Sequence, residues 1–118
     1  MTTVKRVLFI CQQNRLRSPT AEALFRDQPG WEVRSAGLAA EAVHSLDREL
    51  LAWADLVFVM ERRQRNRIHK DFPDLYRQKR IICLYIPDMY DYMDPELQLL
   101  LRERVGPYLE ESTAPPVD

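Results

Sequence analysis

The feature that most constrains the fold of this chain is a series of short apolar segments separated by segments with helical spacing. The apolar segments cover residues 4–10, 31–35, 55–60 and 80–86. Three of them are apolar on both faces, which is typical of strands buried inside a parallel sheet, whereas 31–35 alternates. Strands that alternate with helices favour a sheet covered on both faces. The sequence therefore predicts an open three-layer α/β sandwich with a four-stranded parallel sheet, for which we expect the strand order 2-1-3-4.

The helices are expected to begin at residues that cap a helix N-terminus. Ser18 precedes Pro19, and proline suits the first helical position. Ser45 is the expected cap of a second helix, and Asp94 is the expected cap of the last one. A third helix is expected over residues 61–70.

Prolines are expected to limit two of these helices. Pro73 should end the third helix, and Gly106 with Pro107 should kink or interrupt the last one. We expect a single domain over residues 1–111, followed by a flexible C-terminal tail at 112–118.

Composition places the chain among ordinary globular proteins, with 46% apolar and 30% charged residues. No apolar segment approaches the roughly 20 residues that a membrane span needs, and the N-terminus shows no signal-peptide pattern. The two cysteines, Cys11 and Cys83, are too few for a disulfide framework. We therefore expect a cytoplasmic protein with no membrane partner, in which both cysteines are reduced thiols.

The charge of the chain argues against a nucleic-acid partner, because the formal net charge is −1. Basic residues nevertheless gather in the segment ERRQRNRIHK, residues 61–70. Such a block is usually a solvated face, and the alternative is a docking surface for an anionic partner.

Chemically useful residues are concentrated after the first predicted strand, at Cys11. The polar loop that follows leads into a helix, so its backbone N–H groups and the helix N-terminus face a common point. Such a loop binds anions and favours the nucleophilic thiolate. Arg17 can hold two oxygens of a tetrahedral oxyanion, and Glu61 and Asp88 follow strands that end at the same edge. A buried structural thiol is the alternative for Cys11.

The segment ICQQNRLRSPTAE, residues 10–22, resembles the signature loop of the low-molecular-weight protein tyrosine phosphatases. Segments 33–38, 54–60 and 86–90 are similar to further segments of that family, in the same order along the chain. The residues that match the signature loop are Cys11, Asn14, Arg17, Ser18, Pro19, Ala21 and Glu22. The chain therefore resembles a short variant of this family.

The resemblance implies a two-step phosphoryl transfer. Cys11 would attack phosphorus and form a phosphocysteine, while Arg17 and the loop amides would stabilise the negative charge. Ser18 would donate a hydrogen bond to the sulfur, and Asn14 would hold the loop, although an ordinary turn role is the alternative for Asn14. The phosphate-binding loop would comprise Gln12, Gln13, Asn14, Arg15, Leu16 and Ser18.

The acid that protonates the leaving group is to be found in PDMYDYMDP, which contains Asp88, Asp91 and Asp94. The family places its acid just past the fourth strand, which favours Asp88. Asp94 precedes a proline, as in the family's acid dipeptide, but an aspartate at that place is also expected as a helix cap. Tyr90 and Tyr92 would wall the substrate entrance, or would simply pack on the loop.

Two departures from the family pattern bear on regulation and specificity. Leu16 replaces a second cysteine that is common before the arginine, so oxidised Cys11 would have no resolving thiol unless Cys83 is near. Gln13 replaces a small residue, and the chain is shorter than usual between residue 38 and the third strand. Substrate preference therefore stays open.

Three functions are compatible with the sequence. The first is a cysteine-dependent phosphatase acting on a phosphotyrosine protein or a small aryl phosphate. The second is an arsenate reductase of the same fold, which needs further cysteines, and the third is a catalytically silent phosphate-binding or docking module. His44 and His69 stand apart from other ligand residues, so we predict no metal site and no cofactor.

Overall fold

A computed structural model describes the backbone of residues 4–113 and the side chains as far as Leu109. The strands are β1 (Lys5–Cys11), β2 (Trp31–Gly37), β3 (Leu56–Val59) and β4 (Arg80–Cys83). The helices are α1 (Arg17–Phe25), α2 (Arg48–Trp53), α3 (Arg62–Asp71), α4 (Pro73–Gln78) and α5 (Pro95–Thr113).

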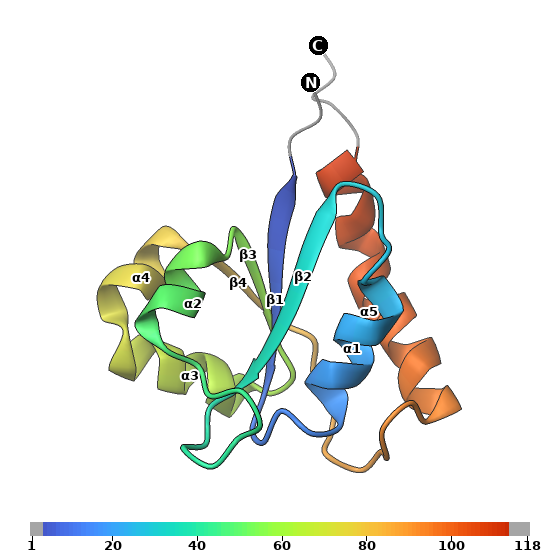
Figure 1. The fold of residues 1–118 in the computed structure, drawn as a ribbon, viewed down its shortest axis with the longest axis horizontal. Coiled ribbons are helices and arrows are strands. Elements are labelled where there is room, and N and C mark those ends of the chain that lie inside the picture. Colours follow the sequence, from blue (N-terminus) through green and yellow to red (C-terminus); the bar gives the residue numbers. More distant parts are fainter. Residues whose placement is uncertain (1–3, 114–118) are drawn as a thin grey trace.

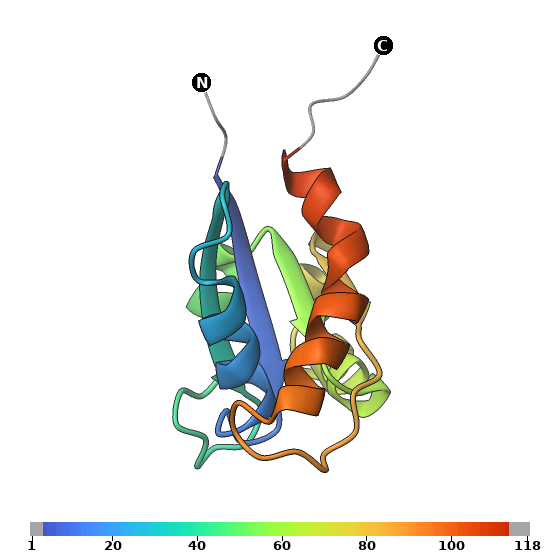
Figure 2. The same cartoon turned by 90° about the vertical axis from the view of Figure 1, so that its right-hand side faces the viewer.

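The strands form one parallel sheet in the order β2-β1-β3-β4, which confirms the predicted architecture. Helices α1 and α5 cover one face of the sheet, and α2, α3 and α4 cover the other (Figures 1 and 2). The carboxyl ends of β1, β3 and β4 therefore open at one edge of the sheet, where the loops that follow them meet.

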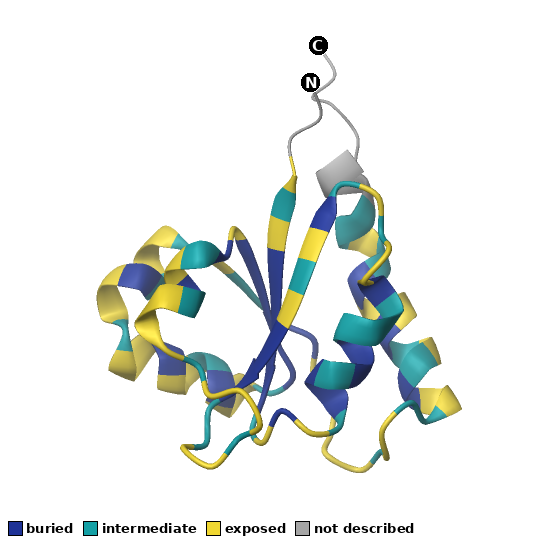
Figure 3. Cartoon of the chain, in the orientation of Figure 1, coloured by how far each residue is buried: buried dark blue, intermediate teal, exposed yellow. Residues whose placement is uncertain are grey.

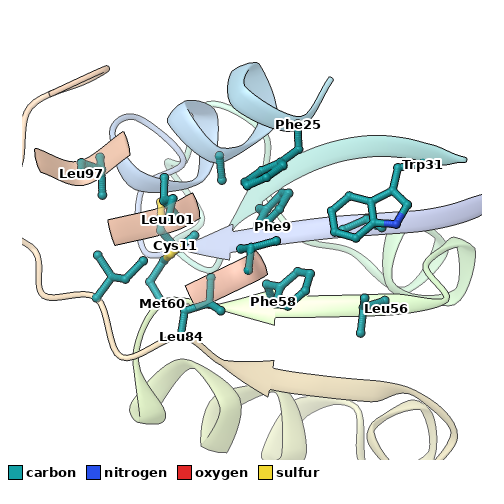
Figure 4. Close-up of a cluster of buried hydrophobic side chains, with 14 residues drawn as sticks. Phe9, Cys11, Phe25, Trp31, Leu56, Phe58, Met60, Leu84, Leu97 and Leu101 are labelled. Carbon is teal, nitrogen blue, oxygen red and sulfur yellow. The ribbon is translucent and has the colours of Figure 1, made fainter. Parts of the chain in front are cut away.

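Each face of the sheet carries its own hydrophobic core, because successive strand side chains point to opposite faces. The central strands β1 and β3 are largely buried (Figure 3). Under α1 and α5, Phe9 stacks on Phe58 with ring centroids 5.2 Å apart, and Phe25 and Trp31 complete an aromatic cluster (Figure 4). The core under the other helices includes Leu8, Ile10, Leu51, Val57, Val59 and Ile68. The sheet is thus held rigidly from both sides.

Two predicted helix caps are wrong. Ser18 does not cap α1, because the helix already begins at Arg17. Ser45 does not cap α2, because Asp47 lies next to the helix and accepts a hydrogen bond from the Leu50 N–H at 2.8 Å. The Ser45 hydroxyl instead donates to backbone carbonyls of the preceding loop. Serine and aspartate are comparable caps, so sequence spacing alone does not choose between them.

Two prolines are accommodated within helical structure. Pro73 begins α4, which was not predicted, because the first helical position needs no N–H donor. Helix α5 continues through Pro107 without interruption, contrary to the prediction for Gly106 and Pro107. Val105 and Tyr108, on either side of Pro107, pack against the core. The free energy of this packing outweighs the cost of the backbone hydrogen bond that is lost at proline.

The predicted C-terminal tail is only partly covered by the structure. Residues 112 and 113 form the end of α5, whereas 114–118 lie outside the described residues. The tail at 112–118 and the domain bounds 1–111 therefore stay predictions. Among the described residues, no helix combines the length and the apolar character that a membrane span requires.

Gly37 is the point where β2 meets the loop that follows β1. A Cβ atom on Gly37 would lie 2.6 Å from the Ala42 Cβ, 2.8 Å from the Gln12 carbonyl oxygen and 2.9 Å from the Asn14 nitrogen. Two of these contacts are with backbone atoms, which cannot move aside as the end of a flexible side chain can. Glycine is therefore required here for close approach of the two loops.

We predict that Gly37→Ala lowers the free energy of unfolding by about 1–3 kcal/mol, because the added methyl group overpacks the loop. Denaturant unfolding measures this change. Gly106→Ala is the matched control, since its Cβ would meet nothing within 4 Å, and it should change stability by less than about 1 kcal/mol. Equal effects of the two substitutions would contradict the prediction.

Candidate active site

The loop between β1 and α1 is held open by the segment that follows β2. The carbonyl oxygens of Cys11, Gln12 and Gln13 accept hydrogen bonds of 2.9–3.2 Å from N–H groups within residues 38–43. A carbonyl and the next N–H point in opposite directions across a trans peptide, so the loop N–H groups face the other side. The Asn14 N–H, which donates to the Cys11 Sγ at 3.2 Å, shows this direction. The loop therefore presents backbone donors around the sulfur.

Asn14 holds the loop in a left-handed conformation, with φ of 54°. Its side-chain Nδ2 donates to the Ser18 Oγ at 2.9 Å and to the Ser35 Oγ at 3.0 Å, and Ser35 donates to a Glu22 carboxylate oxygen at 2.8 Å. Asparagine tolerates this backbone region better than most residues. The predicted loop-holding position of Asn14 therefore coincides with a buried hydrogen-bond network, of which Ser35 and Glu22 were not predicted as members.

The Cys11 side chain is 3% exposed, and its sulfur lies 3.0 Å from the Ser18 Oγ. Asn14 donates to that hydroxyl oxygen, so the hydroxyl hydrogen can be donated to the sulfur or to the Ala36 carbonyl oxygen at 3.4 Å. A thiolate could only accept it. This contact explains why Ser18 does not serve as a helix cap. It also brings Ser18 to the position expected for a donor to the nucleophile.

Arg17 is 2% exposed, and a buried guanidinium has to be paired within the protein. Its Nη1 donates to the Glu61 Oε1 at 2.7 Å and to the Ile86 carbonyl oxygen at 2.8 Å. Its Nε lies 3.7 Å from the Asp88 Oδ1. Arg17 therefore joins the loop after β1 to the chain that follows β3 and β4.

Glu61 was expected at the same sheet edge but was not predicted as the partner of Arg17. Burial raises the pKa of Glu61, but hydrogen bonds and charge from Arg17, with a smaller contribution from Arg63, hold it below its ordinary value. The Glu61 N–H donates to the Gln64 Oε1 at 2.9 Å as part of a capping box at the start of α3. Glu61 is thus fixed both as a cap and as a counterion.

The segment 84–94 carries the acid candidates and is tethered at both ends. Arg104 donates to the carbonyl oxygens of Leu84 and Tyr85 at 2.6 and 3.2 Å, and the Met93 N–H donates to the Thr20 Oγ1 at 2.9 Å. Tyr85 and Met93 adopt left-handed backbone conformations, with φ of 55° and 61°. Between these tethers the segment places Asp88 and Tyr92 on the linings of two cavities beside the loop.

Asp88 and Asp94 occupy different environments. Asp88 is 56% exposed and lines the same cavity as Cys11 and Arg17. The Asp94 Oδ1 instead accepts a hydrogen bond from the Glu96 N–H at 2.8 Å, which is the contact of a helix cap. Asp91 is exposed and does not line that cavity. Of Asp88, Asp91 and Asp94, only Asp88 therefore shares this cavity with Cys11 and Arg17.

Two cavities lie beside the loop. The smaller has a volume of about 160 Å³ and is lined by Cys11, Gln13, Arg15, Leu16, Arg17 and Asp88. The larger has a volume of about 380 Å³ and is lined by Asn14, Arg15, Pro19, Glu22, Ser35, Val43, His44 and Tyr92. Of the two tyrosines expected at the entrance, Tyr92 lines the larger cavity, whereas Tyr90 packs against the core under α5.

Cys83 lies on the other side of the sheet from Cys11. Both cysteines are buried and free, but Cys11 belongs to the core under α1 and α5, whereas Cys83 belongs to the core under α2, α3 and α4. The sheet separates the two sulfur atoms. Cys83 is therefore a core residue and is not placed to form a disulfide with Cys11.

Comparison with known proteins agrees with this geometry. The sequence model of the family described as low molecular weight phosphotyrosine protein phosphatase matches residues 6–53. The protein-arginine-phosphatase of Geobacillus stearothermophilus is 33% identical in an alignment over 93 residues, and the match covers 58% of this chain and 63% of that relative. The match therefore spans less than two thirds of the relative's length.

Solved structures share the fold over nearly the whole chain. The YwlE arginine phosphatase from Geobacillus stearothermophilus superposes with a TM-score of 0.69 at 24% identity, covering 97% of this chain and 99% of that chain. The tyrosine phosphatase Wzb from Escherichia coli K30, in complex with phosphate, superposes with a TM-score of 0.72 at 24% identity, covering 92% and 99%.

The fold and the loop geometry define the chain as an α/β sandwich in which backbone donors surround a buried cysteine at the carboxyl end of the first strand. The match of the family model to residues 6–53, together with the shared fold, confirms the predicted resemblance to the low molecular weight phosphotyrosine protein phosphatase family. The proteins named above comprise both an arginine phosphatase and a tyrosine phosphatase, so the resemblance does not by itself determine the substrate.

We predict that Glu61→Gln lowers the free energy of unfolding at pH 7 by about 1–3 kcal/mol, because the buried Arg17 loses its charged partner. The pKa of Glu61 is below its ordinary value of 4.5 in the folded protein. The ion pair therefore stabilises the fold above that value, and its contribution falls as the pH drops through the lowered pKa. Urea unfolding between pH 7 and pH 3 should show the two proteins converging in acid.

Asp74→Asn is the control for this pH dependence. A hydrogen bond from Arg48 lowers the pKa of Asp74 as well, but both side chains are exposed. Its loss should therefore be smaller than that of Glu61→Gln at pH 7. A wild-type minus Glu61→Gln difference that stays constant from pH 7 to pH 3 would show that the carboxylate charge is not what Arg17 requires.

Proposed function

We propose that this protein is a cysteine-dependent phosphatase that hydrolyses phosphotyrosine, or a small aryl phosphate, through a phosphocysteine intermediate. The observation that supports the proposal most strongly is the joint position of Cys11, Arg17 and Asp88. The three residues line one cavity, next to the backbone donors of the loop. A nucleophile, a cation and an acid are the groups that transfer of a phosphoryl group requires.

In the first step, the Cys11 thiolate attacks phosphorus as the bond from phosphorus to the leaving oxygen breaks. Asp88 gives its proton to that oxygen, and the loop amides with Arg17 stabilise the negative charge on the phosphoryl oxygens. In the second step, water attacks phosphorus, the Asp88 carboxylate takes a proton from it, and the bond from sulfur to phosphorus breaks. A hydrogen bond from Ser18 to the sulfur stabilises the departing thiolate.

A phosphoarginine phosphatase is the second candidate. It is favoured by the 33% identity to a protein-arginine-phosphatase over 93 residues. Phosphotyrosine and phosphoarginine peptides of one sequence, assayed side by side, distinguish the two. An arsenate reductase is disfavoured because Cys83, the one other cysteine, lies across the sheet from Cys11.

We keep the cytoplasm as the predicted location, because a catalytic thiol has to stay reduced.

We predict that Cys11→Ser lowers the hydrolysis of para-nitrophenyl phosphate by at least about a thousand-fold, because serine lacks the thiolate nucleophile. Cys83→Ser is the matched control, since Cys83 is also buried but lies on the opposite face of the sheet. It should cost stability rather than turnover per folded molecule. Full activity of folded Cys11→Ser would refute a cysteine-based mechanism, and an inactive wild type would favour the silent phosphate-binding module.

We predict that Asp88→Asn lowers kcat by about 10²- to 10⁴-fold on an alkyl-substituted phenyl phosphate, whose leaving group needs protonation. The inhibition constant for inorganic phosphate should stay within a few-fold of the wild-type value. Asp94→Asn is the control, because asparagine caps a helix about as well as aspartate, and it should retain most activity. The reverse pattern, with loss only in Asp94→Asn, would move the acid to Asp94.

A further inference from the structure

Arg15 is the residue that the two cavities beside the loop have in common. It lines the smaller cavity with Cys11 and Arg17, and it lines the larger cavity with Val43 and Tyr92. Any ligand that fills the smaller cavity and extends toward the larger one has to pass its side chain.

The charge of Arg15 is not compensated by the protein. Its side chain is exposed, and it forms no ion pair or hydrogen bond with any residue in the part of the chain that the structure describes. By contrast, the charge of Arg17 is met by Glu61 and Asp88, and that of Arg63 is met by Glu61. Arg15 is therefore a free cation at the rim of the predicted phosphate pocket.

The larger cavity combines this cation with apolar walls. Val43 and Tyr92 are exposed hydrophobic side chains on its lining. The Glu22 carboxylate on the same lining accepts a hydrogen bond from Ser35 at 2.8 Å and keeps its negative charge. Glu22 also lines a further cavity with Arg34 and Leu50, whereas Arg15 lines the cavity of Cys11, so the two charges mark different ends of the larger cavity. A short apolar stem that ends in a carboxylate matches this surface, and a guanidinium binds a carboxylate through two parallel hydrogen bonds.

We propose that the larger cavity is a substrate subsite that binds an acidic side chain adjacent to the phosphotyrosine, with Arg15 as the residue that recognises its carboxylate. The inference rests on the proposed function, because it assumes that a phosphorylated side chain fills the smaller cavity. The peptide backbone then lies at the rim, and a neighbouring aspartate or glutamate reaches Arg15. The same charge disfavours substrates with a cationic group at that place.

Binding to the Cys11→Ser variant tests the subsite without turnover. Phosphotyrosine peptides that carry glutamate, glutamine or lysine on each side of the phosphotyrosine are compared by calorimetry. The glutamate peptide should bind roughly 3- to 10-fold more tightly than the glutamine peptide, and the lysine peptide should bind most weakly. The ratio should shrink as salt is raised, because the pair is exposed to solvent.

Arg15→Gln should reduce the ratio of glutamate to glutamine affinities to about one, and Arg15→Lys should restore part of it. Arg62→Gln is the matched control, since Arg62 is an exposed arginine of the basic segment 61–70 outside both cavities. Val43→Glu, an independent change on the cavity wall, should reduce the preference for the glutamate peptide, because it adds a negative charge to the lining that carries Arg15. A ratio that survives Arg15→Gln but is lost in Arg62→Gln would overturn the proposal and assign acidic recognition to the basic segment.

The kinetic assay separates this proposal from the proposed function. Wild-type turnover of phosphotyrosine peptides with a glutamate to glutamine ratio of one would overturn the subsite and leave the phosphatase standing. An affinity ratio that depends on Arg15, in a protein that hydrolyses none of the peptides, would support the subsite and overturn the phosphatase. If no peptide binds at all, the subsite falls, and hydrolysis of para-nitrophenyl phosphate by the wild type decides separately whether the protein is a phosphatase.

Discussion

The buried charge of Arg17 is the constraint on which the rest of the site depends. A guanidinium removed from water has to be neutralised by the protein, and its partners come from distant parts of the chain. Glu61 follows β3, and the Ile86 carbonyl follows β4. They can meet Arg17 because β3 lies next to β1 and β4 lies next to β3 in the sheet. The pairing of the Arg17 side chain therefore depends on the order of the strands in the sheet.

The loop between β1 and α1 is oriented by hydrogen bonds from another backbone segment. The segment 38–43 takes up the carbonyl oxygens of Cys11, Gln12 and Gln13, and this turns the opposite N–H groups toward the sulfur. The same segment contributes Val43 to the wall of the larger cavity. One short loop thus orients the backbone donors around the Cys11 sulfur and shapes the surface next to them. Its position requires glycine at residue 37.

Most of the sheet could be predicted from the sequence, and so could the fact that Cys11, Arg17 and Asp88 meet at one edge of it, because both depend on local patterns and strand order. Buried strands are marked by apolar runs, and Cys11 and Arg17 stand in a strand-loop-helix context. What could not be predicted are contacts that only the tertiary structure creates. Glu61 was expected at the correct edge, but nothing local marks it as the counterion of Arg17. Ser18 fits the pattern of a helix cap equally well, and only the proximity of the sulfur decides its role.

The predictions for two prolines failed because packing in the folded protein competes with the local preference of the residue. Pro107 is compatible with α5 because Val105 and Tyr108 are anchored in the core on either side of it. Pro73 begins a helix that its neighbours would not have suggested, since proline is equally suited to ending one helix and starting the next. In both cases the residue type restricts the backbone without choosing between the outcomes.

The non-glycine residues with left-handed backbone in the described chain are Asn14, Tyr85 and Met93. One lies in the phosphate loop, and the other two bracket the segment that carries Asp88. Each such conformation costs of order 1–3 kcal/mol unless its surroundings compensate. The molecule therefore concentrates its conformational cost around the pocket, while the sheet beneath it is unstrained and densely packed. Selection for thermal stability alone would first replace these three residues by ones that suit a left-handed backbone. The resulting protein would be more stable, but the geometry of the pocket would no longer be maintained by selection.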